Sequence, residues 1–225
     1  MLFTLPGQRL EAAAELVRPG AYVADIGTDH AYLPIYLVGR GIASRAVASD
    51  INRGPLERAA SNIRAAGLSD RISLLLTDGV DGLFGLGVTD YLICGMGGEL
   101  IASVTEAPFL RDPSVLLILQ PMTKPEILRK SLLDRRFSIK DERLAEEAGR
   151  IYQIFSAAFT GVTEKYSDAE LLLGRGNILR GGELYIRLAN RETEMIRRRL
   201  AGKKSAGLDT SDDEALLSEI GATLK

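Results

Sequence analysis

Over the first 160 residues, short apolar runs alternate with segments in which apolar residues recur every three or four positions. The first pattern is typical of buried strands and the second of one face of a helix. Strands are predicted over residues 21–26, 45–50, 72–77, 90–94 and 115–119. Helices are predicted over residues 9–18, from residue 31, over 52–66, after the glycines at 95–98, and over 124–133. Strands and helices in regular alternation predict an α/β fold around a parallel sheet.

An antiparallel pair is predicted to close this sheet. Residues 137–145 and 151–159 are rich in aromatic and β-branched residues, and a short turn near Gly149 separates them. Five parallel strands and this pair make a seven-stranded sheet. We expect the domain that contains it to span residues 1–160.

The pattern changes after Gly161, where no further strand is predicted. Residues 183–200 and 212–224 have helical periodicity, and residues 201–210 connect them. The apolar stripes consist of Leu184, Leu188, Met195 and Leu200 in the first helix, and of Leu216, Leu217, Ile220 and Leu224 in the second. Two such stripes predict an antiparallel helical pair, so we expect an α-helical domain over residues 161–225.

Composition excludes several classes of protein. A content of 46% hydrophobic residues is too high for a disordered chain, and one cysteine with one histidine leaves no internal disulfide and too few ligands for zinc. No apolar run has the length of a membrane span, and charges stand near the N-terminus where a signal peptide is apolar. We therefore expect a cytoplasmic protein that binds neither a membrane nor a metal. Nothing in the sequence indicates its oligomeric state.

Positive charge gathers in one segment, although the net charge of the chain is −2. Residues 187–204 hold seven Arg or Lys against two Glu, an excess that suits a phosphate backbone. A helix face exposed to solvent can have the same composition. The candidate contacts to nucleic acid are Arg197, Arg198, Arg199, Lys203 and Lys204.

Polar residues and glycines stand at the carboxyl ends of four of the predicted strands. They are Asp25, Gly27, Thr28, Asp29 and His30 at the end of the first, Asp50 and Ile51 at the second, Asp78 and Gly79 at the third, and Cys94 to Gly98 at the fourth. Because the carboxyl ends of parallel strands meet at one edge of a sheet, these residues are expected to lie close together. A ligand site is therefore predicted at this edge.

The first of these turns limits the kind of ligand. It has Gly27 alone, where a dinucleotide site has the G-x-G-x-x-G set, so a pyrophosphate is not expected. The carboxylates of Asp25 and Asp29 would repel phosphate but suit a cofactor with a cationic amino-acid end, such as S-adenosylmethionine. Asp50 could bind the hydroxyls of a ribose, and Asp78 could accept a hydrogen bond from an adenine amino group. A single Asp after a strand is more often a turn residue or helix cap, but the set together favours a cofactor site.

Three further side chains near these turns have competing interpretations. His30 has no second histidine as a partner, which favours a structural place near the cofactor. Cys94 is interpreted as a small buried residue rather than a nucleophile. Tyr32 either packs the first helix or stacks on a purine drawn into the site.

Five segments of the chain carry a resemblance to a known family. ADIGTDHAYLPIYL, RGPLERAASNI, ICGMGGELI, LILQPM and EEAGRIYQIFSAAF resemble, in order and spacing, the bacterial tRNA (adenine-22 N1)-methyltransferase family over about Leu5 to Phe159. The resemblance implies a Rossmann-like class I catalytic domain that uses S-adenosyl-L-methionine, followed by a coiled-coil-like helical domain that helps to hold tRNA. Methylation at N1 of adenine 22 is implied by the resemblance alone.

The predicted site residues follow from the strand ends and from this resemblance. Cofactor binding is predicted for Asp25, Gly27, Thr28, His30, Asp50, Ile51, Asp78, Gly79, Gly95, Gly97 and Gly98. Substrate binding is predicted for Gln120, Pro121 and Met122 and for the five basic residues named above. Two positions depart from the family, because Asp50 stands where it usually has Glu and Met122 where it has Asn. Asp50 keeps the ribose chemistry, whereas Met122 lacks the side-chain amide with which asparagine could contact the base.

Catalysis is predicted to rest on Asp29, Tyr32, Gly95 and Met96. Adenine N1 has an in-plane lone pair, so no base is needed, and the enzyme must position the reactants and stabilise a cationic product. Asp29 is expected near the adenine amino group or the developing cation, and Tyr32 is expected to stack on or orient the base. The backbone of residues 95–98 is expected to form a close-fitting wall, where larger side chains would block the purine. Asp29 could instead cap the helix that follows it.

Other functions stay open at this point. A methyltransferase acting on a small molecule would not need the basic helix, and a non-catalytic module could bind S-adenosylmethionine or RNA without modifying it. Binding of a nicotinamide or flavin would instead favour an oxidoreductase.

Overall fold

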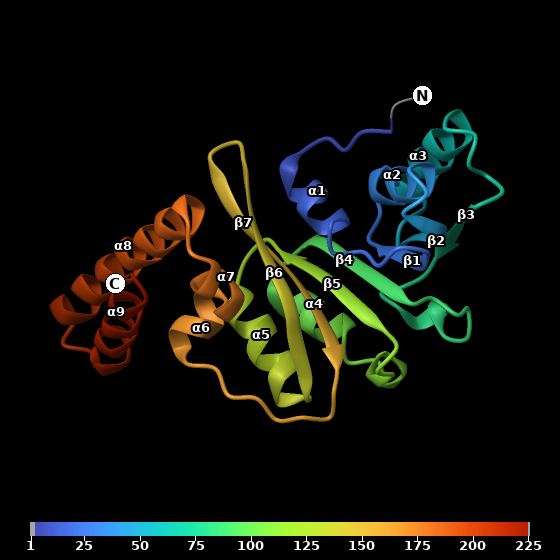
Figure 1. Ribbon diagram of the computed structural model, residues 1–225. Helices are drawn as coiled ribbons and strands as arrows, with labels where there is room; N and C mark the ends of the chain where they lie inside the picture. Colours follow the sequence, from blue (N-terminus) through green and yellow to red (C-terminus); the bar gives the residue numbers. More distant parts are fainter. Residues whose placement is uncertain (1–2, 225) are drawn as a thin grey trace. The chain divides into compact units, whose positions relative to one another are not determined.

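A computed structural model describes residues 3–224 of the chain, which forms two compact units, Met1–Glu164 and Lys165–Lys225. The first unit is built on a seven-stranded sheet with the order β3-β2-β1-β4-β5-β7-β6 (Figure 1). Its strands are β1 Ala21–Ile26, β2 Ala43–Asp50, β3 Ile72–Leu76, β4 Asp90–Met96, β5 Leu116–Pro121, β6 Phe137–Glu147 and β7 Arg150–Phe159. Strands β1 to β5 are parallel, and β7 is antiparallel to both β5 and β6. This confirms the predicted Rossmann-like fold class.

Helices cover both faces of the sheet (Figure 1). They are α1 Gln8–Ala14, α2 Tyr32–Gly39, α3 Arg53–Ala65, α4 Gly98–Val104 and α5 Pro125–Asp134, with short 3₁₀ turns η1 Asp81–Leu83 and η2 Pro108–Arg111. Side chains alternate between the faces along each strand. Val23 of β1 packs into the core under α1 to α3, and its neighbour Ala24 into the core under α4 and α5.

The strand order places a switch point beside β1. Asp25 lies between Ala48 of β2 and Leu92 of β4 in the sheet. The next strand in the chain, β2, pairs with one side of β1, and β4 pairs with the other side. In open α/β sheets a crevice forms at such a point, beyond the carboxyl ends of the strands.

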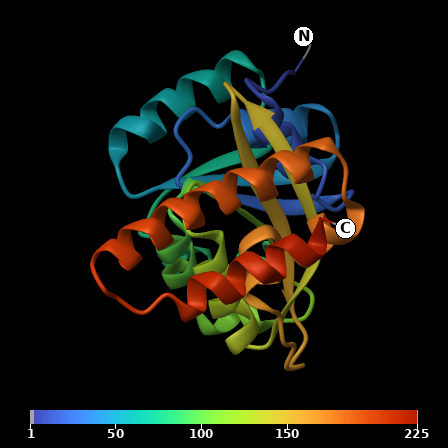
Figure 2. The same ribbon diagram turned by 90° about the vertical axis from the view of Figure 1, so that its left-hand side faces the viewer.

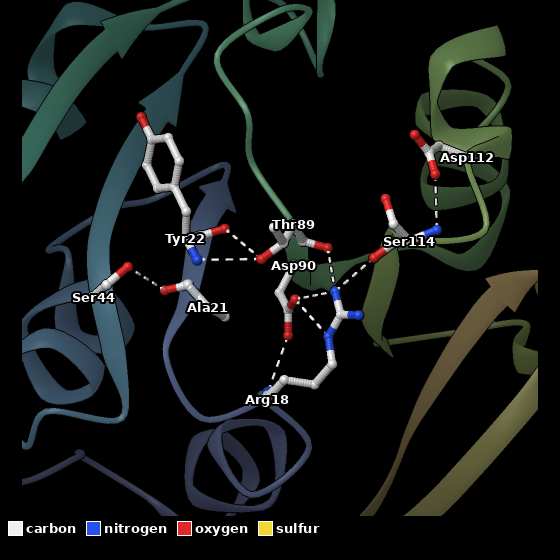
Figure 3. Close-up of polar contacts among 8 residues, drawn as sticks. All are labelled: Arg18, Ala21, Tyr22, Ser44, Thr89, Asp90, Asp112 and Ser114. Carbon is white, nitrogen blue, oxygen red and sulfur yellow. Dashed lines mark hydrogen bonds and ion pairs between the residues drawn. The ribbon is translucent and has the colours of Figure 1, made fainter.

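Helix α1 is shorter than the predicted helix over residues 9–18, because it ends at Ala14. The chain then turns so that Arg18 reaches Asp90 at the start of β4 (Figure 3). Arg18 donates from its backbone N to Oδ2 of Asp90 at 3.0 Å and from Nε to Oδ1 at 2.9 Å. Its Nη2 also donates to the carbonyl oxygens of Thr89 and Ser114. This contact fastens the segment between α1 and β1 to the amino ends of β4 and β5.

The second unit contains only helices among its described residues, namely α6 Asp168–Leu173, α7 Arg175–Arg180, α8 Glu183–Ser205 and α9 Ser211–Thr223. Helices α6 and α7 were not predicted, since six residues are too few to show a helical period. Helix α8 extends five residues beyond the end of the helix predicted over residues 183–200. Helix α6 begins with a capping box in which Ser167 and Glu170 bind each other's backbone N–H groups.

Helices α8 and α9 lie side by side (Figure 2). The buried residues of α8 are Tyr185, Leu188, Ala189 and Ile196, and the hydroxyl of Tyr185 donates to the Thr223 hydroxyl of α9. Met195 was predicted in this stripe, but its side chain is 58% exposed, so that assignment is wrong. Ile220 of α9 is fully buried, as predicted.

None of the helices within residues 3–224 combines the length and the apolar character required to cross a membrane.

Candidate functional site

A cavity of about 250 Å3 opens at the carboxyl edge of the sheet, where β1 and β4 end. Seven of the predicted site residues line it: Asp25, Gly27, Thr28, Asp29, His30, Tyr32 and Gly95. Cys94 lines it as well, and so does Arg9 of α1, which is not among the predicted site residues. The turn after β1 and the end of β4 therefore meet as expected, and α1 adds a third wall.

The turn after β1 is shaped by Gly27 and Thr28. Gly27 has φ +73°, and a Cβ there would collide with the end of the Met96 side chain. The backbone N of Thr28 donates to the Ser49 carbonyl at 2.8 Å, and its hydroxyl accepts from the N–H of Ala31 at 3.2 Å. The N-cap residue of α2 is Ala31, no side chain caps the helix, and the Asp29 carboxylate contacts Arg58 and His30, so the alternative in which Asp29 caps this helix is wrong.

Asp25 is an acidic residue buried near the end of β1. It is buried, with 7% exposure, and burial raises the pKa of its carboxyl to about 6. The Thr28 side chain lowers the pKa by a hydrogen bond, while the charge of Asp50 raises it further. At neutral pH the cavity therefore holds a poorly solvated carboxylate, which a bound cation would stabilise.

Asp29 lies at the mouth of the cavity between two other side chains. Arg58 of α3 donates to its Oδ1 from Nε at 3.0 Å and also from Nη2, and Nε2 of His30 lies 3.2 Å from its Oδ2. The hydrogen bond from Arg58 lowers the pKa of Asp29, so this carboxyl is ionised at neutral pH. The ring of His30 stacks on Tyr32 with centroids 5.0 Å apart and planes 25° from parallel. Arg58, Asp29, His30 and Tyr32 form a continuous chain of contacts that includes one further residue not foreseen, Arg58.

Gln120 is buried beneath the cavity and is fully enclosed. Its Oε1 accepts hydrogen bonds from Arg9 Nη1 at 2.6 Å and from the N–H of Gly95 at 3.1 Å. Its Nε2 donates to the Pro121 carbonyl at 2.9 Å. The polar atoms of Gln120 thus face protein groups, and its neighbour Met122 is 40% exposed at the surface.

Gly95, near the end of β4, and Gly98, just after β4, serve different purposes. Gly95 has φ +85° and lines the cavity. Gly98 donates to the Thr123 carbonyl at 2.9 Å, and a Cβ on it would collide with the carbonyl oxygen of Lys124. At Gly98 the close approach is to the chain that follows β5, so this glycine is required by backbone packing.

The predicted residues after β2 and β3 lie outside the lining of this cavity. Asp50 accepts from the N–H of Asn52 at 2.7 Å through one oxygen, which leaves its other oxygen for a ligand. Ile51 is 59% exposed beside it, and Asp78 is exposed at the end of β3. Their roles at the ribose and adenine stay predictions.

Cys94 has no nucleophilic character in this site. Burial, with a smaller effect from the charge of Asp25, raises the pKa of its thiol to about 12. The thiol stays protonated and contributes apolar packing. In the part of the chain that the structure describes, no group of three or more His, Cys, Asp or Glu could hold a metal ion.

The basic residues of α8 are largely engaged by acids. Arg199 and Lys203 both contact Asp213 of α9, at 2.5 and 2.9 Å, and these hydrogen bonds lower the pKa of Asp213. Lys204 pairs with Glu214 at 2.9 Å and Arg198 with Glu194 at 3.0 Å. Only Arg197 among the five predicted cations forms no ion pair with another described residue.

The sequence of this chain is similar to a known family of domains and to a characterised protein. A family model described as a methyltransferase domain matches residues 7–155. The tRNA (adenine(22)-N(1))-methyltransferase of Bacillus subtilis is 39% identical over 171 residues, which cover 74% of this chain and 71% of that protein.

Solved structures of similar proteins superpose on nearly the whole chain. The Bacillus subtilis m1A22 tRNA methyltransferase superposes with a TM-score of 0.83 at 30% identity, covering 98% of this chain and 96% of that one. A candidate tRNA (m1A22) methyltransferase from Streptococcus pneumoniae, solved with S-adenosyl-L-methionine, gives 0.86 at 31% identity and covers 98% and 100%.

Proposed function

The chain belongs to the methyltransferase-domain family and, within it, to the tRNA (adenine(22)-N1)-methyltransferases, and we propose that it transfers the methyl group of S-adenosyl-L-methionine to N1 of adenine 22 in tRNA. The observation that carries the proposal is the buried carboxylate of Asp25 beside the single-glycine turn at the switch point. Such a site suits a cationic amino-acid end and lacks the features that bind a pyrophosphate.

The residues of the cavity fit this cofactor. Asp25 offers a negative charge and Arg9 a positive one, which match the ammonium and the carboxylate of an α-amino acid. When bound, S-adenosyl-L-methionine supplies an activated methyl group on its sulfonium. Asp50 and Asp78 follow the adjacent strands, where we place the ribose and the adenine.

The protein's own task is to position the adenine of the tRNA. Because N1 carries an in-plane lone pair, no side chain has to remove a proton, and orientation alone contributes about 7 kcal/mol or more in favourable cases. The stacked rings of His30 and Tyr32 form a platform at the cavity mouth on which an extruded base can lie. Asp29 stands beside this platform, where its carboxylate can accept from the adenine amino group while Arg58 and His30 fix its orientation.

A direct assay tests the function. Labelled S-adenosyl-L-methionine is incubated with an unmodified tRNA transcript and with a transcript that has guanosine at position 22. Label is expected in 1-methyladenosine at position 22 of the first transcript and absent from the second. Binding of tRNA without label would indicate a non-catalytic module, and methylation of small molecules alone would indicate the other enzyme class.

Removing the Tyr32 ring should slow methylation. Stacking on an aromatic side chain is worth about 1–3 kcal/mol per base, so Tyr32→Ala should reduce the single-turnover rate about 10- to 100-fold. Tyr32→Phe keeps the ring and should stay within about threefold of the parent, as should the control Tyr36→Phe on the same helix. Affinity for S-adenosyl-L-methionine should not change. A parental rate in Tyr32→Ala would remove this residue from base binding.

We further propose that the unit Lys165–Lys225 binds the tRNA backbone through the outward cations of α8. Arg197 and Arg198 are exposed and have no partner on α9, whereas Arg199 and Lys203 hold α9 through Asp213. The predicted basic surface therefore divides into two groups. Arg197 forms no ion pair within the described part of the chain and Arg198 pairs only with the exposed Glu194 of its own helix, whereas Arg199, Lys203 and Lys204 pair with acids of α9.

Neutralising Arg197 and Arg198 together should weaken tRNA binding. The logarithm of the tRNA binding constant falls linearly with the logarithm of the salt concentration, and each lost phosphate contact should make this slope less steep by about 1. The double variant to Gln should therefore have a slope that is less steep by about 2. The matched control replaces Lys130, an exposed cation of α5 that pairs with Asp134. Filter binding from about 50 to 200 mM salt gives both slopes, and equal slopes in parent and double variant would exclude this surface.

A further inference from the structure

The peptide group between His30 and Ala31 is held at both of its ends. Its N–H donates to the Thr28 hydroxyl at 3.2 Å, and its carbonyl oxygen accepts from the side-chain amide of Asn62 on α3 at 3.0 Å. Resting on the proposed function, we infer that Asn62 is a positioning residue for the methylation. Its hydrogen bond fixes this peptide group and, through it, the stacked rings of His30 and Tyr32 on which the adenine lies.

Ala31 has a backbone conformation that requires support from its surroundings. Its φ of +55° and ψ of +30° lie in the left-handed region, which residues other than glycine adopt uncommonly. Such a residue keeps this conformation only where neighbouring contacts determine it. Rotation of the peptide plane before Ala31 changes ψ of His30 and φ of Ala31. The hydrogen bonds at the two ends of this plane therefore hold Ala31 in the left-handed region.

The conformation of Ala31 sets the direction of the two rings, because Ala31 is the residue between His30 and Tyr32. Side chains two positions apart on a helix do not face each other. Here the rings stack, with centroids 5.0 Å apart and planes 25° from parallel. Loss of the left-handed conformation at Ala31 would separate the rings, and the adenine would lose part of the surface on which it is expected to lie.

Helix α3 holds this loop at two consecutive residues. Arg58 donates from Nε to Oδ1 of Asp29 at 3.0 Å, and Asn62, one turn further along the helix, donates to the His30 carbonyl. Residues four apart lie on the same face of a helix. Asparagine is a poor helix former, because its side chain competes for backbone groups. In α3 the side chain of Asn62 reaches the loop, so it serves the loop rather than its own helix.

Replacing Asn62 with alanine tests the inference. Alanine removes the amide and is the stronger helix former, so α3 should stay folded. Single-turnover methylation of an unmodified tRNA transcript at saturating S-adenosyl-L-methionine should slow about tenfold, because a base that is out of line reacts slowly. The affinities for S-adenosyl-L-methionine and for tRNA should stay within about twofold of the parent. The matched control is Ser61→Ala, at an exposed position on the same helix, which should keep the parental rate.

A second substitution, at Ala31, should restore part of the rate. Glycine adopts a positive φ without steric cost, so Ala31→Gly reduces the need for the Asn62 hydrogen bond. The double variant Asn62→Ala, Ala31→Gly should therefore methylate about threefold faster than Asn62→Ala, or more. A residue that only stabilised α3 would not be rescued in this way.

A double-mutant cycle with Tyr32 tests whether Asn62 acts through the rings. In the Tyr32→Ala background the ring that Asn62 helps to place is absent. Asn62→Ala should therefore slow this variant by less than about twofold, although it slows the parent about tenfold. Equal losses in the two backgrounds would mean that Asn62 acts by another route, and they would overturn the inference.

Other outcomes would also overturn it. A parental rate in Asn62→Ala would remove this residue from the reaction. Loss of thermal stability and of both affinities in Asn62→Ala, without recovery by Ala31→Gly, would make Asn62 a structural residue. A parent protein that transfers no methyl group to adenine 22 would refute the proposed function, and the inference with it. That result is distinct from failure of the Asn62 assignment, in which the parent is active and Asn62→Ala is equally so.

Discussion

Replacing Asp25 with asparagine should stabilise the protein without cofactor by about 3 kcal/mol at pH 8, since burial raises the pKa of this carboxyl from 3.8 to about 6 and each pKa unit corresponds to about 1.4 kcal/mol. The charged carboxylate is buried beside Asp50, whose charge adds to the cost. Asparagine has nearly the same shape, carries no charge and can still accept the hydrogen bond from Thr28.

The difference between variant and parent depends on pH in a defined direction. Between about pH 4 and pH 6 the folded parent keeps a proton on Asp25 that the unfolded chain releases. Asp25 therefore makes the parent more stable as the pH falls through 6, and it is destabilising by a constant amount above that value. The stability gain of Asp25→Asn should thus be full at pH 8 and vanish near pH 4.

Chemical denaturation at pH 4, 6 and 8 measures this difference. Asp78→Asn, at an exposed position after β3, serves as the control and should change stability by less than about 0.5 kcal/mol. Saturating S-adenosyl-L-methionine should make the parent more stable than Asp25→Asn at pH 8. The ammonium of the bound cofactor would pair with the Asp25 carboxylate, which the variant lacks. A variant that is less stable than the parent at pH 8 would contradict the buried-charge account.

Removing Arg18 should destabilise the protein by about 3–5 kcal/mol, because it leaves the Asp90 carboxylate buried without a cation. Asp90 is completely buried at the start of β4, whereas the Arg18 side chain is 44% exposed. Removing Asp90 should therefore cost less, about 1–2 kcal/mol, because water can solvate the remaining guanidinium.

A double-mutant cycle tests this asymmetry. Arg18→Met, Asp90→Asn and the double variant are compared by urea denaturation, and the double variant should be more stable than Arg18→Met alone. Lys130→Met breaks an exposed pair with Asp134 and should cost less than about 1 kcal/mol. Equal costs for both single variants would mean that the burial of Asp90 does not control the stability of this contact.

The strands of the sheet and their polar ends could be predicted because both follow from local pattern. The predicted strand at residues 21–26 matches β1 residue for residue, and the strand at 90–94 was only two residues short of β4. Burial on both faces of a parallel sheet makes such strands apolar along their whole length. Topology then brings the residues that follow them to one edge.

The partners of the charged residues could not be predicted, because they come from distant parts of the chain. Asp29 is 29 positions from Arg58, and Arg9 is 111 positions from Gln120. Asp213 and Glu214 lie on a second helix that folds back on α8. They form ion pairs with Arg199 and Lys204, two of the cations that were predicted to contact nucleic acid.

The α/β class, the position of the polar turn after β1 and, through the motifs, the enzyme family could all be predicted from the sequence. These features depend on residue spacing within single elements, where periodicity and turn chemistry act locally. Tertiary structure alone decided which charges are buried, paired or left to face a ligand. The raised pKa of Asp25 and the hydrogen bond of the Arg9 guanidinium to Gln120 both arise from how α1, β1 and β4 pack around one cavity. The ionisation of a side chain depends on its solvation and on neighbouring charges, which the order of residues does not specify.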